Sequence, residues 1–259
     1  MPNPDPFVWY DLLTTDTKAA ADFYRSVIGW TAADSGLKDR SYTLLSMGDA
    51  VVGGIMPIPP SAAAEGARPM WNGYIGVEDV DQHADRVKAA GGHIHHAPED
   101  LPSRIGRFAV VADPQGAVFT LFEGGENMAP PSHEPNLAPG HFGWNELQAA
   151  DGPTAFDFYA DLFGWTKGEA HDMGPMGVYQ VFSTGGAPAG GIMTKAPQSP
   201  APPHWLFYIN VEAADAAVDR LQQAGGQLLQ GPHQVPGGGW IVVALDPQGA
   251  VFALVAPKR

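Results

Sequence analysis

One heptapeptide occurs twice in this chain, since residues 113–119 read Asp-Pro-Gln-Gly-Ala-Val-Phe and residues 246–252 repeat all seven letters. Other positions pair at an offset of about 135 residues: Trp9 with Trp144, Asp11 with Glu146, Phe23-Tyr24 with Phe158-Tyr159, and Trp30 with Trp165. Similarity at a fixed internal period is typical of repeat architectures. The sequence therefore predicts two copies of one domain, with a small drift in loop length between them.

Each half contains the same order of elements twice, namely one strand, one helix and three strands. Asp16, Asp79 and Asp151 stand where a residue would cap a helix, and apolar residues at helical spacing follow. Residues 57–70 are rich in Pro and Ala and are predicted to form a connection without an element of its own. The predicted organisation is a first domain over 1–124 (units about 7–56 and 71–123), a Pro-rich linker over 125–140, and a second domain over 141–259 (units about 141–193 and 204–256).

Composition excludes several classes of function. The chain has no cysteine, which rules out disulfides, thiolate metal sites and cysteine nucleophiles. Its net charge of −14 argues against nucleic acid as a partner, because phosphate backbones attract clustered Lys and Arg. No apolar run approaches the ~20 residues of a membrane-spanning helix, and the first residues lack the features of a signal peptide. We therefore expect a cytoplasmic protein without a membrane partner.

The segments FYRSVIGW (23–30) and FYADLFGW (158–165), together with AAGG and DPQGAVF, resemble the vicinal oxygen chelate superfamily of glyoxalases, bleomycin-resistance proteins and extradiol dioxygenases. The resemblance covers residues 7 to 256 and implies an α+β fold. Each domain is then expected to form an open, cup-shaped, eight-stranded sheet from two βαβββ units, with a ligand inside. A tandem copy also supplies the pairing that single-domain relatives obtain by dimerising, so a monomer is expected to suffice.

Metal-dependent members of that superfamily place metal ligands on inward-facing strand positions. By the resemblance, these positions map to Trp9 and Trp144 on the first strands, near Asn72 and Leu206 on the opening strand of the second units, and to Thr120 and Ala253 on the last strands. Trp, Leu and Ala cannot coordinate a divalent cation, which prefers imidazole or carboxylate ligands. The expectation is therefore that no metal cofactor is bound and that the family's catalytic residues do not carry over.

The candidate ligand-binding residues are aromatic and carboxylate side chains on the inner strands. If the first strand alternates, Trp9 and Asp11 share one face, and so do Trp144 and Glu146. The full candidate set is Trp9, Asp11, Trp71, Asn72, Tyr74, Thr120, Trp144, Glu146, His204, Trp205 and Tyr208. The alternative for the aromatic members is that they only fill the core, and for the acids that they pair with a backbone donor or an arginine.

The sequence leads to one main hypothesis and two alternatives. The main hypothesis is a metal-free protein that binds a small molecule, hydrophobic or cationic, between aromatic walls and one carboxylate. The first alternative is a lyase, isomerase or dioxygenase that holds Zn, Ni, Mn or Fe through residues such as His204, Glu146 or Asp11. The second is an interaction module without a ligand.

Overall fold

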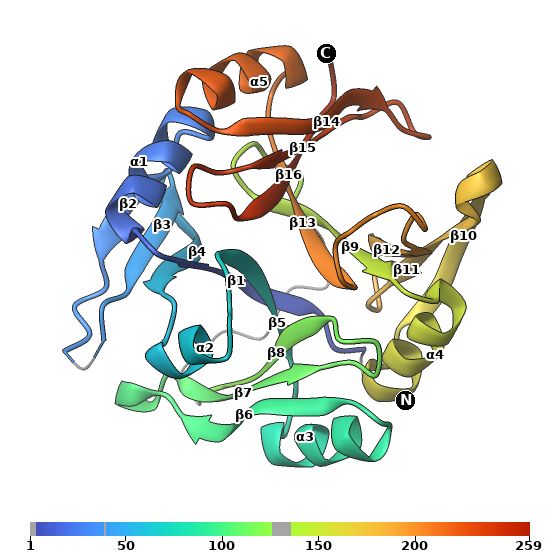
Figure 1. Ribbon diagram of the computed structural model, residues 1–259. Coiled ribbons are helices and arrows are strands. Elements are labelled where there is room, and N and C mark those ends of the chain that lie inside the picture. The colour runs from blue at the N-terminus through green and yellow to red at the C-terminus, as the bar shows by residue number, and fades with distance from the viewer. Residues whose placement is uncertain (1–3, 39, 126–135) are drawn as a thin grey trace. The chain divides into compact units, whose positions relative to one another are not determined.

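The computed structural model describes residues 4–38, 40–125 and 136–259 (Figure 1). Most of the predicted linker over 125–140 lies outside the described residues, because 126–135 are not among them. None of the helices in the described ranges has the length and apolar character needed to cross a membrane.

The first half of the chain contains eight strands and three α-helices among the described residues. They are β1 (Phe7–Thr14), α1 (Thr17–Val27), β2 (Thr31–Asp34), β3 (Thr43–Met47), β4 (Ala50–Pro57), α2 (Pro60–Ala64), β5 (Met70–Gly76), α3 (Val80–Ala89), β6 (His93–Asp100), β7 (Gly106–Ala112) and β8 (Val118–Gly124).

The second half repeats this order, without a counterpart of α2 among the described residues. Its elements are β9 (Phe142–Ala149), α4 (Gly152–Phe163), β10 (Thr166–Asp172), β11 (Val178–Ser183), β12 (Pro188–Thr194), β13 (His204–Asn210), α5 (Ala214–Gln223), β14 (Gln227–Gln234), β15 (Trp240–Leu245) and β16 (Val251–Ala256).

The strands form two open sheets of eight strands each. The order is β2-β3-β4-β1-β5-β8-β7-β6 in the first sheet and β10-β11-β12-β9-β13-β16-β15-β14 in the second, so the two sheets correspond strand for strand. In each βαβββ module the first strand pairs in parallel with the last, as β1 does with β4 and β9 with β12. The predicted α+β architecture of duplicated βαβββ modules is confirmed.

Helix starts follow the capping residues read from the sequence. The carboxylates of Asp16, Asp79 and Asp151 each accept a hydrogen bond from a backbone N–H three residues later, at 2.8 to 2.9 Å. These bonds satisfy one of the amide groups that a helix leaves unpaired at its first turn. The fourth long helix, α5, has Ala213 at this position and lacks a side-chain cap.

The expectation that residues 57–70 contain no element is wrong. Residues 60–64 form the short helix α2, with Pro60 in its first turn. A proline there costs no hydrogen bond, because the first amides of a helix have no partner within the helix, and its fixed φ suits the helical conformation. The alanines that follow then extend one turn.

The chain divides into two compact units, and each unit takes one βαβββ module from each half of the sequence. Unit 1 consists of Met1–Trp9, Gly73–Pro135 and Trp144–Trp205, and unit 2 of Tyr10–Asn72, Asn136–Gly143 and Leu206–Arg259. The predicted boundaries 1–124 and 141–259 delimit the two sequence repeats. As boundaries of domains, they stay a prediction.

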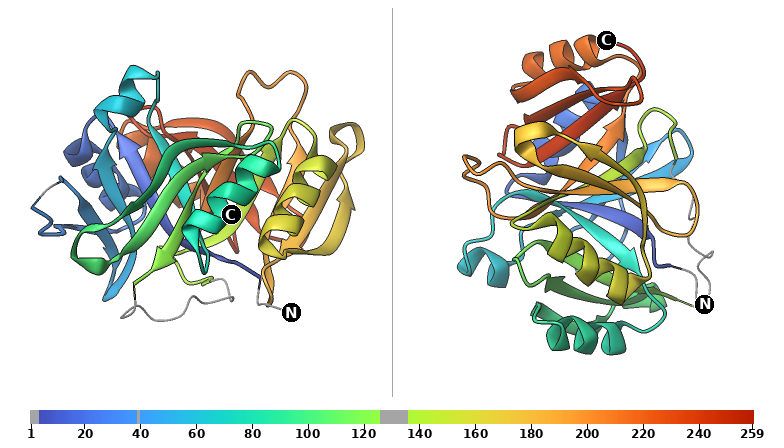
Figure 2. Two further views of the ribbon diagram at one scale, coloured as in Figure 1. Left: turned by 90° about the horizontal axis from the view of Figure 1, so that it is seen from below. Right: turned by 90° about the vertical axis from the view of Figure 1, so that its right-hand side faces the viewer.

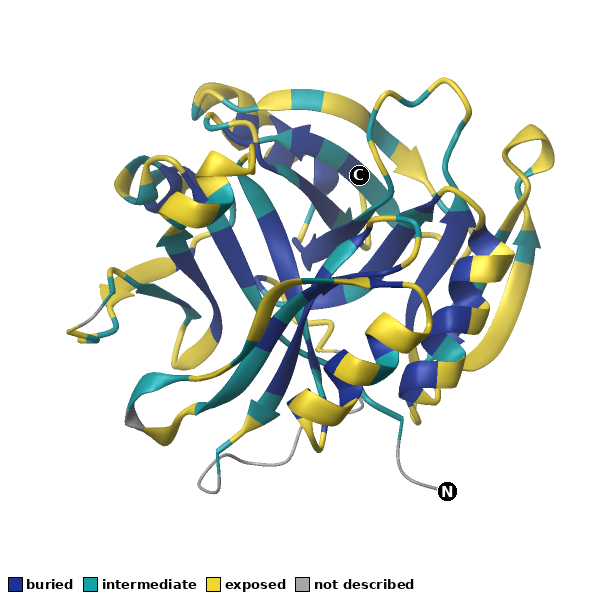
Figure 3. Ribbon diagram, turned by 60° about the horizontal axis from the view of Figure 1, so that its bottom comes forward, coloured by how far each residue is buried: buried dark blue, intermediate teal, exposed yellow. Residues whose placement is uncertain are grey.

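Unit 1 buries its apolar side chains between helices and strands. Helix α3 lies against β6 and β7, and α4 lies against β12 (Figure 2). Both helices turn a buried face toward the strands and an exposed face outward (Figure 3). Their core contains an aromatic cluster in which Trp165 stacks on Phe182 at 4.3 Å and on Tyr159 at 5.2 Å between ring centroids.

Unit 2 has a corresponding aromatic cluster. Tyr24 stacks on Trp30 at 5.6 Å between ring centroids and meets Trp71 and Phe252 edge to face. The indole N–H of Trp30 donates to the carbonyl of Gly140 at 2.7 Å, as that of Trp165 in unit 1 donates to the carbonyl of Asp5. The repeated tryptophans are therefore anchored by equivalent bonds to the backbone that precedes a first strand.

The repeated heptapeptide supplies a buried hydrogen-bond acceptor in unit 1. Asp113 Oδ1 accepts the backbone N–H groups of Gln115 and Ala117 at 2.8 and 2.9 Å, which closes the turn. Asp113 Oδ2 accepts the hydroxyl of Tyr159 at 3.1 Å, and that hydroxyl accepts the indole N–H of Trp205 at 3.0 Å. A turn of the first half is thus fixed to a helix and a strand of the second half.

Unit 2 contains the same Trp-Tyr-Asp chain with the halves exchanged. The indole of Trp71 donates to the hydroxyl of Tyr24 at 2.8 Å, and this hydroxyl donates to Asp246 Oδ2 at 3.3 Å. Burial raises the pKa of Asp246, and burial together with the nearby Asp246 charge raises the pKa of Tyr24 well above its ordinary value. Both copies of the heptapeptide therefore provide the buried aspartate that the Trp-Tyr-Asp chain of each unit requires.

Candidate functional site

The second half of the chain gathers three polar or aromatic side chains around one carboxylate, that of Glu146. Trp144, Glu146 and Gln148 project from one face of β9, because alternate residues of a strand point the same way. The hydroxyl of Tyr179, on β11, donates to Glu146 Oε2 at 3.0 Å and accepts the indole N–H of Trp144 at 2.7 Å. The amide Nε2 of Gln148 donates to Glu146 Oε1 at 2.6 Å. Strand alternation thus brings together the pair Trp144 and Glu146 that the sequence predicted on one face.

Burial differs within this cluster, which we call the Glu146 site. The Glu146 residue is buried, whereas Trp144, Gln148 and Tyr179 are half-buried. Burial and the charge of Glu146 raise the pKa of Tyr179 well above its ordinary value. The phenol therefore stays protonated at neutral pH and acts as a hydrogen-bond donor to the carboxylate.

The first half contains a corresponding pair, which we call the Asp11 site. The hydroxyl of Tyr42 donates to Asp11 Oδ1 at 2.6 Å. Asp11 is 2% exposed, and Tyr42 is half-buried. Each half therefore contains one buried carboxylate that accepts a hydrogen bond from a tyrosine of the following hairpin.

A glycine on the neighbouring strand makes room for each tyrosine. Asp11 is paired with Gly54 across the parallel strands β1 and β4, and Glu146 with Gly191 across β9 and β12. A Cβ at Gly54 would overlap Tyr42 and crowd Asp11 Oδ1, and a Cβ at Gly191 would overlap the ring of Tyr179. The repeated Gly-Gly-Ile-Met segments thus preserve the space that the carboxylate and tyrosine pairs occupy.

We expect Gly191→Ala to displace Tyr179 from Glu146 and to lower the free energy of unfolding by about 1–3 kcal/mol, the usual cost of overpacking. Urea denaturation followed by tryptophan fluorescence measures the change. Gly239→Ala is the matched control, because a Cβ there meets its nearest atom at an ordinary 3.7 Å. If Gly191→Ala lowers the free energy of unfolding no more than Gly239→Ala does, Gly191 does not make room for the Tyr179 ring.

Two of the predicted ligand-site residues lie in the aromatic cores. Trp71 and Trp205 are 4% and 6% exposed, and their indole N–H groups donate to the buried hydroxyls of Tyr24 and Tyr159. These contacts favour the packing alternative for both tryptophans.

The other candidates on the inner strands of the first sheet are buried or half-buried. Tyr74 pairs with Thr120 between the parallel strands β5 and β8, and its ring meets Phe122 edge to face. Thr120 is fully buried and Asn72 is 5% exposed. Trp9 is half-buried on β1. Their contact with a ligand stays a prediction.

In the second sheet, β13 carries the two remaining candidates. His204 is half-buried, and its Nδ1 bonds the carbonyl of Pro202 at 2.8 Å, which makes Nδ1 the donor of a neutral ring and leaves Nε2 as an acceptor. Burial lowers the pKa of His204, and the charge of Lys195 lowers it further. Tyr208 is buried and pairs with Ala253 on β16.

Sequence reasoning missed Tyr42, Tyr179 and Gln148. Tyr42 and Tyr179 are 137 positions apart, which is also the offset between the Gly-Gly-Ile-Met segments, so the repeat alignment contained the signal. Gln148 follows from the alternation that placed Trp144 and Glu146 on one face. Its counterpart in the first half is the apolar Leu13, so comparison of the two copies gives no hint of a shared role.

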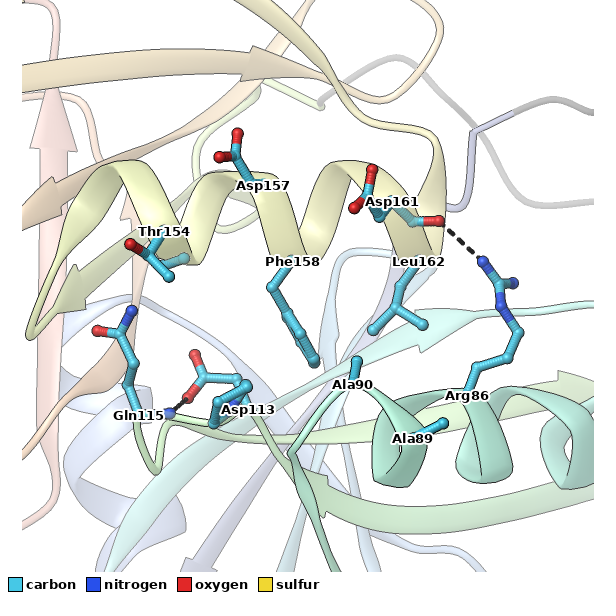
Figure 4. Close-up of a pocket in the computed structure, with 12 residues that line it drawn as sticks. Arg86, Ala89, Ala90, Asp113, Gln115, Thr154, Asp157, Phe158, Asp161 and Leu162 are labelled. Carbon is cyan, nitrogen blue, oxygen red and sulfur yellow. Dashed lines mark hydrogen bonds between the residues drawn. The ribbon is translucent and has the colours of Figure 1, made fainter.

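A separate groove lies in unit 1 between α3, α4 and the turn at Asp113 (Figure 4). Its volume is about 600 Å³. The guanidinium of Arg86 donates to the carbonyl of Asp161 across one end of it at 2.8 Å. At the other end, the amide of Gln115 exchanges two hydrogen bonds with the backbone of Asp151. No lining residue of this groove belongs to the Glu146 or Asp11 sites.

Both halves of the chain match one known protein family. A family model described as Glyoxalase/Bleomycin resistance protein/Dioxygenase superfamily matches residues 7–121 and 139–254. A Mycobacterium bovis protein named "Putative glyoxylase CFP32" is 34% identical over 251 residues, which cover 96% of this chain and 94% of that protein. The "Anthracycline biosynthesis protein DnrV" of Streptomyces peucetius is 32% identical over 266 residues, covering 97% and 93%.

Solved structures with the same fold include enzymes, one of which is bound to a metal. A Mn(II)-bound glyoxalase from Novosphingobium aromaticivorans superposes with a TM-score of 0.64 at 16% identity, covering 98% of this chain and 82% of that one. The 2,3-dioxygenase LapB from Pseudomonas sp. KL28 gives 0.62 at 15% identity, covering 99% and 93%. At these identities the likeness shows the fold alone.

The side chains present do not fit a metal centre of the kind such a neighbour holds. Across residues 4–38, 40–125 and 136–259, no three His, Cys, Asp or Glu side chains are grouped so that they could hold an ion. At the Glu146 site, both carboxylate oxygens already accept hydrogen bonds, and the surrounding indole and protonated phenol are poor ligands. Divalent metals in proteins are generally bound by three or more N, O or S ligands, which this donor set does not supply.

Proposed function

The chain belongs to the Glyoxalase/Bleomycin resistance protein/Dioxygenase superfamily, and we propose that it binds a small molecule without a metal, at the carboxylate and tyrosine pairs of its two halves. The observation that carries the proposal is the duplicated geometry of a buried carboxylate, a tyrosine hydroxyl and a glycine that makes room for them. Ligand sites are mostly apolar with a few fixed polar groups, and each pair provides such a fixed group.

The relatives support a small-molecule role. One is named as a glyoxylase and another as a protein of anthracycline biosynthesis. Both names refer to small organic molecules, and the family model covers both halves of this chain. We infer that the ligand is an organic molecule that is hydrophobic or cationic, since the candidate residues are aromatic rings and carboxylates. Action in the cytoplasm by a monomer is part of the same proposal.

A ligand screen tests the proposal. Tryptophan fluorescence of the full chain is followed during titration with a library of metabolites and antibiotics. We expect at least one compound to change the emission of the wild type and to lose this effect in Trp9→Phe or Trp144→Phe. A library without any response, together with unaltered behaviour of both variants, would support the alternative of an interaction module.

The competing function is a lyase, isomerase or dioxygenase that uses a divalent metal, and the metal-bound glyoxalase among the structural neighbours favours it. Elemental analysis and calorimetric titration with Zn, Ni, Mn and Fe separate the two functions. We expect no stoichiometric binding in the micromolar range. Stoichiometric binding that is lost in Glu146→Ala or His204→Ala would replace our proposal by the metalloenzyme.

A further inference from the structure

A buried histidine on α3 has two hydrogen-bond partners that fix its protonation state. Among the residues that the structure describes, His83 is the only buried histidine, with 7% of its surface exposed. Its Nδ1 lies 2.9 Å from the carbonyl oxygen of Asp79, and its Nε2 lies 3.1 Å from Nη1 of Arg86. A carbonyl oxygen can only accept a hydrogen bond and a guanidinium can only donate one, so Nδ1 carries the proton and Nε2 accepts. The ring is therefore neutral in this arrangement.

A carboxylate lies close to the accepting nitrogen. Asp5 Oδ2 is 3.5 Å from His83 Nε2, which is longer than the usual hydrogen-bond range of about 2.7–3.2 Å. The backbone of Asp5 is fixed, because its N–H donates to the carbonyl of Phe163 at 2.9 Å and its carbonyl accepts the indole N–H of Trp165 at 2.7 Å. The His83 ring also stacks on Phe163, at 6.1 Å between ring centroids. A protonated ring therefore has an anionic acceptor within a small movement of either side chain.

Asp5 and Arg86 are the charged groups that the described residues place at Nε2. At the start of α3, Asp79 caps the helix and Glu123 of β8 accepts a backbone N–H of the same turn. The charged side chains of β6 are exposed. Those of the other neighbouring elements are exposed or paired with each other, namely Asp81, Asp85 and Lys88 on α3, Asp157 and Asp161 on α4, and Arg107 on β7.

Arg86 connects this histidine to the groove of unit 1. Its Nη2 donates to the carbonyl of Asp161 at 2.8 Å, which joins α3 to the last turn of α4 at one end of the groove (Figure 4). Cations near the end of a helix interact favourably with its last carbonyl groups. With one N–H bound to this carbonyl and another to His83 Nε2, the guanidinium is held in one orientation.

Unit 2 contains the same arginine bond without the histidine. Arg220 of α5 donates from Nε to the carbonyl of the last residue of α1 at 2.9 Å. The repeat offset places Ala217 at the position of His83 and Gly140 at the position of Asp5. Neither alanine nor glycine has a side chain that titrates. The two units therefore share the bond between their helices and differ in the groups that could control it with protons.

From these contacts we propose that His83 is a proton switch for the Arg86 bond between α3 and α4. Uptake of one proton from solvent at Nε2 turns this nitrogen from an acceptor into a donor, so it loses Arg86 Nη1 and gains the Asp5 carboxylate. The guanidinium then faces a positive ring, keeps only the Asp161 carbonyl as an acceptor, and moves away, which loosens that end of the groove. Histidine is the side chain that ordinarily changes charge between about pH 5 and 8, so acidification through this range operates the switch. The switch uses no group of the two carboxylate and tyrosine pairs, and it is therefore independent of the proposed function.

NMR of the wild-type full chain tests the switch. Long-range ¹H–¹⁵N spectra of the histidine rings and spectra of the arginine Nε–H groups are recorded from about pH 8 to about pH 5. We expect His83 to show the Nδ1–H tautomer at the alkaline end and a doubly protonated ring at the acid end. The Nε–H signal of Arg86 should shift with the same midpoint. Arg220 is the internal control, and its signal should stay constant over this range.

Substitutions separate the parts of the switch. His83→Ala, which introduces the residue of unit 2, should abolish the transition of the Arg86 signal. Asp5→Asn keeps the shape of the side chain but removes the charge that favours the protonated ring, so the midpoint of the transition should fall by about one pH unit. Asp157→Asn is the matched control, because it removes a charge from a side chain that is 73% exposed, and solvent screening should leave the midpoint almost unchanged.

A His83 ring that stays neutral down to about pH 5, or one that carries its proton on Nε2 at about pH 8, would overturn the switch. Equal responses of Arg86 and Arg220 in the wild type would overturn it too, because the histidine would not be their cause. An unchanged midpoint in Asp5→Asn would contradict the exchange of partners. The comparison of the two arginines does not depend on whether any variant folds.

Discussion

A Tyr159→Phe substitution is expected to lower the free energy of unfolding by about 2–4 kcal/mol. The change removes only one oxygen atom, but it leaves two buried groups without their partner. These are Asp113 Oδ2, which accepts the phenol, and the indole N–H of Trp205, which donates to it. Leaving a buried polar group unsatisfied costs about 1–3 kcal/mol, and more when the group is charged. Urea denaturation of the wild type and the variant measures the difference.

The duplicated structure provides a twin for this experiment. Tyr24→Phe should cost a similar amount, because Tyr24 has the same partners in unit 2 through Asp246 and Trp71. Asp113→Asn should cost less than Asp113→Ala, since its amide oxygen still accepts the two backbone N–H groups of the turn. A loss below about 0.5 kcal/mol in both tyrosine variants would be typical of a surface position and would contradict a structural role for the hydroxyl.

The fold could be predicted because the sequence patterns that identify its helices and strands are periodic and occur in both halves of the chain. Capping aspartates, strand alternation and the repeat offset each point to the same βαβββ module, and the structure bears them out. The short helix α2 escaped prediction, because one helical turn in a segment rich in Pro and Ala lacks the periodicity that identifies longer helices.

The partners of the repeated heptapeptide could not be predicted in this way. Its Pro and Gly identify a turn, but nothing local shows that Asp113 meets Tyr159 or that Asp246 meets Tyr24. Those contacts join residues 46 and 222 positions apart and depend on which modules share a compact unit. A single sequence gives the modules and their order, whereas their assortment into units follows from packing.

For the candidate site, alternation along the first strand was sufficient to place Trp144 beside Glu146. Alternation could not distinguish Trp144 from Trp71 and Trp205. These two tryptophans have the same aromatic character, but they lie in the core and their indole N–H groups donate to tyrosine hydroxyls. The tyrosines that donate to the two carboxylates come from elsewhere in the sequence, since Tyr179 lies on β11 and Tyr42 directly precedes β3. Only the pairing of β11 with β12 and of β3 with β4 brings them to the carboxylates.

Because of its buried tyrosines, we expect the protein to lose stability at alkaline pH. Burial raises the pKa of Tyr24 and of Tyr159 well above the ordinary value, with the neighbouring aspartate charges adding to the shift. Above the ordinary tyrosine pKa of about 10, the unfolded chain releases these two protons while the folded chain retains them. The unfolded state then binds fewer protons, so the free energy of unfolding decreases as the pH rises. Their stabilising contribution is complete below pH ~10 and is lost from there toward the raised folded pKa.

Linkage gives the magnitude of this loss. One retained proton corresponds to about 1.4 kcal/mol per pH unit, so two tyrosines give roughly 3 kcal/mol per pH unit. Asp113 and Asp246 add nothing to the slope there, because the raised pKa of an aspartate affects stability at acid pH. Urea denaturation at several values between about pH 9 and 11, combined with the absorbance of ionised tyrosine, measures the slope and shows whether ionisation coincides with unfolding. The double variant Tyr24→Phe, Tyr159→Phe should show a slope that is smaller by that amount, and an unaltered slope would mean that the folded protein ionises these phenols as readily as the unfolded chain.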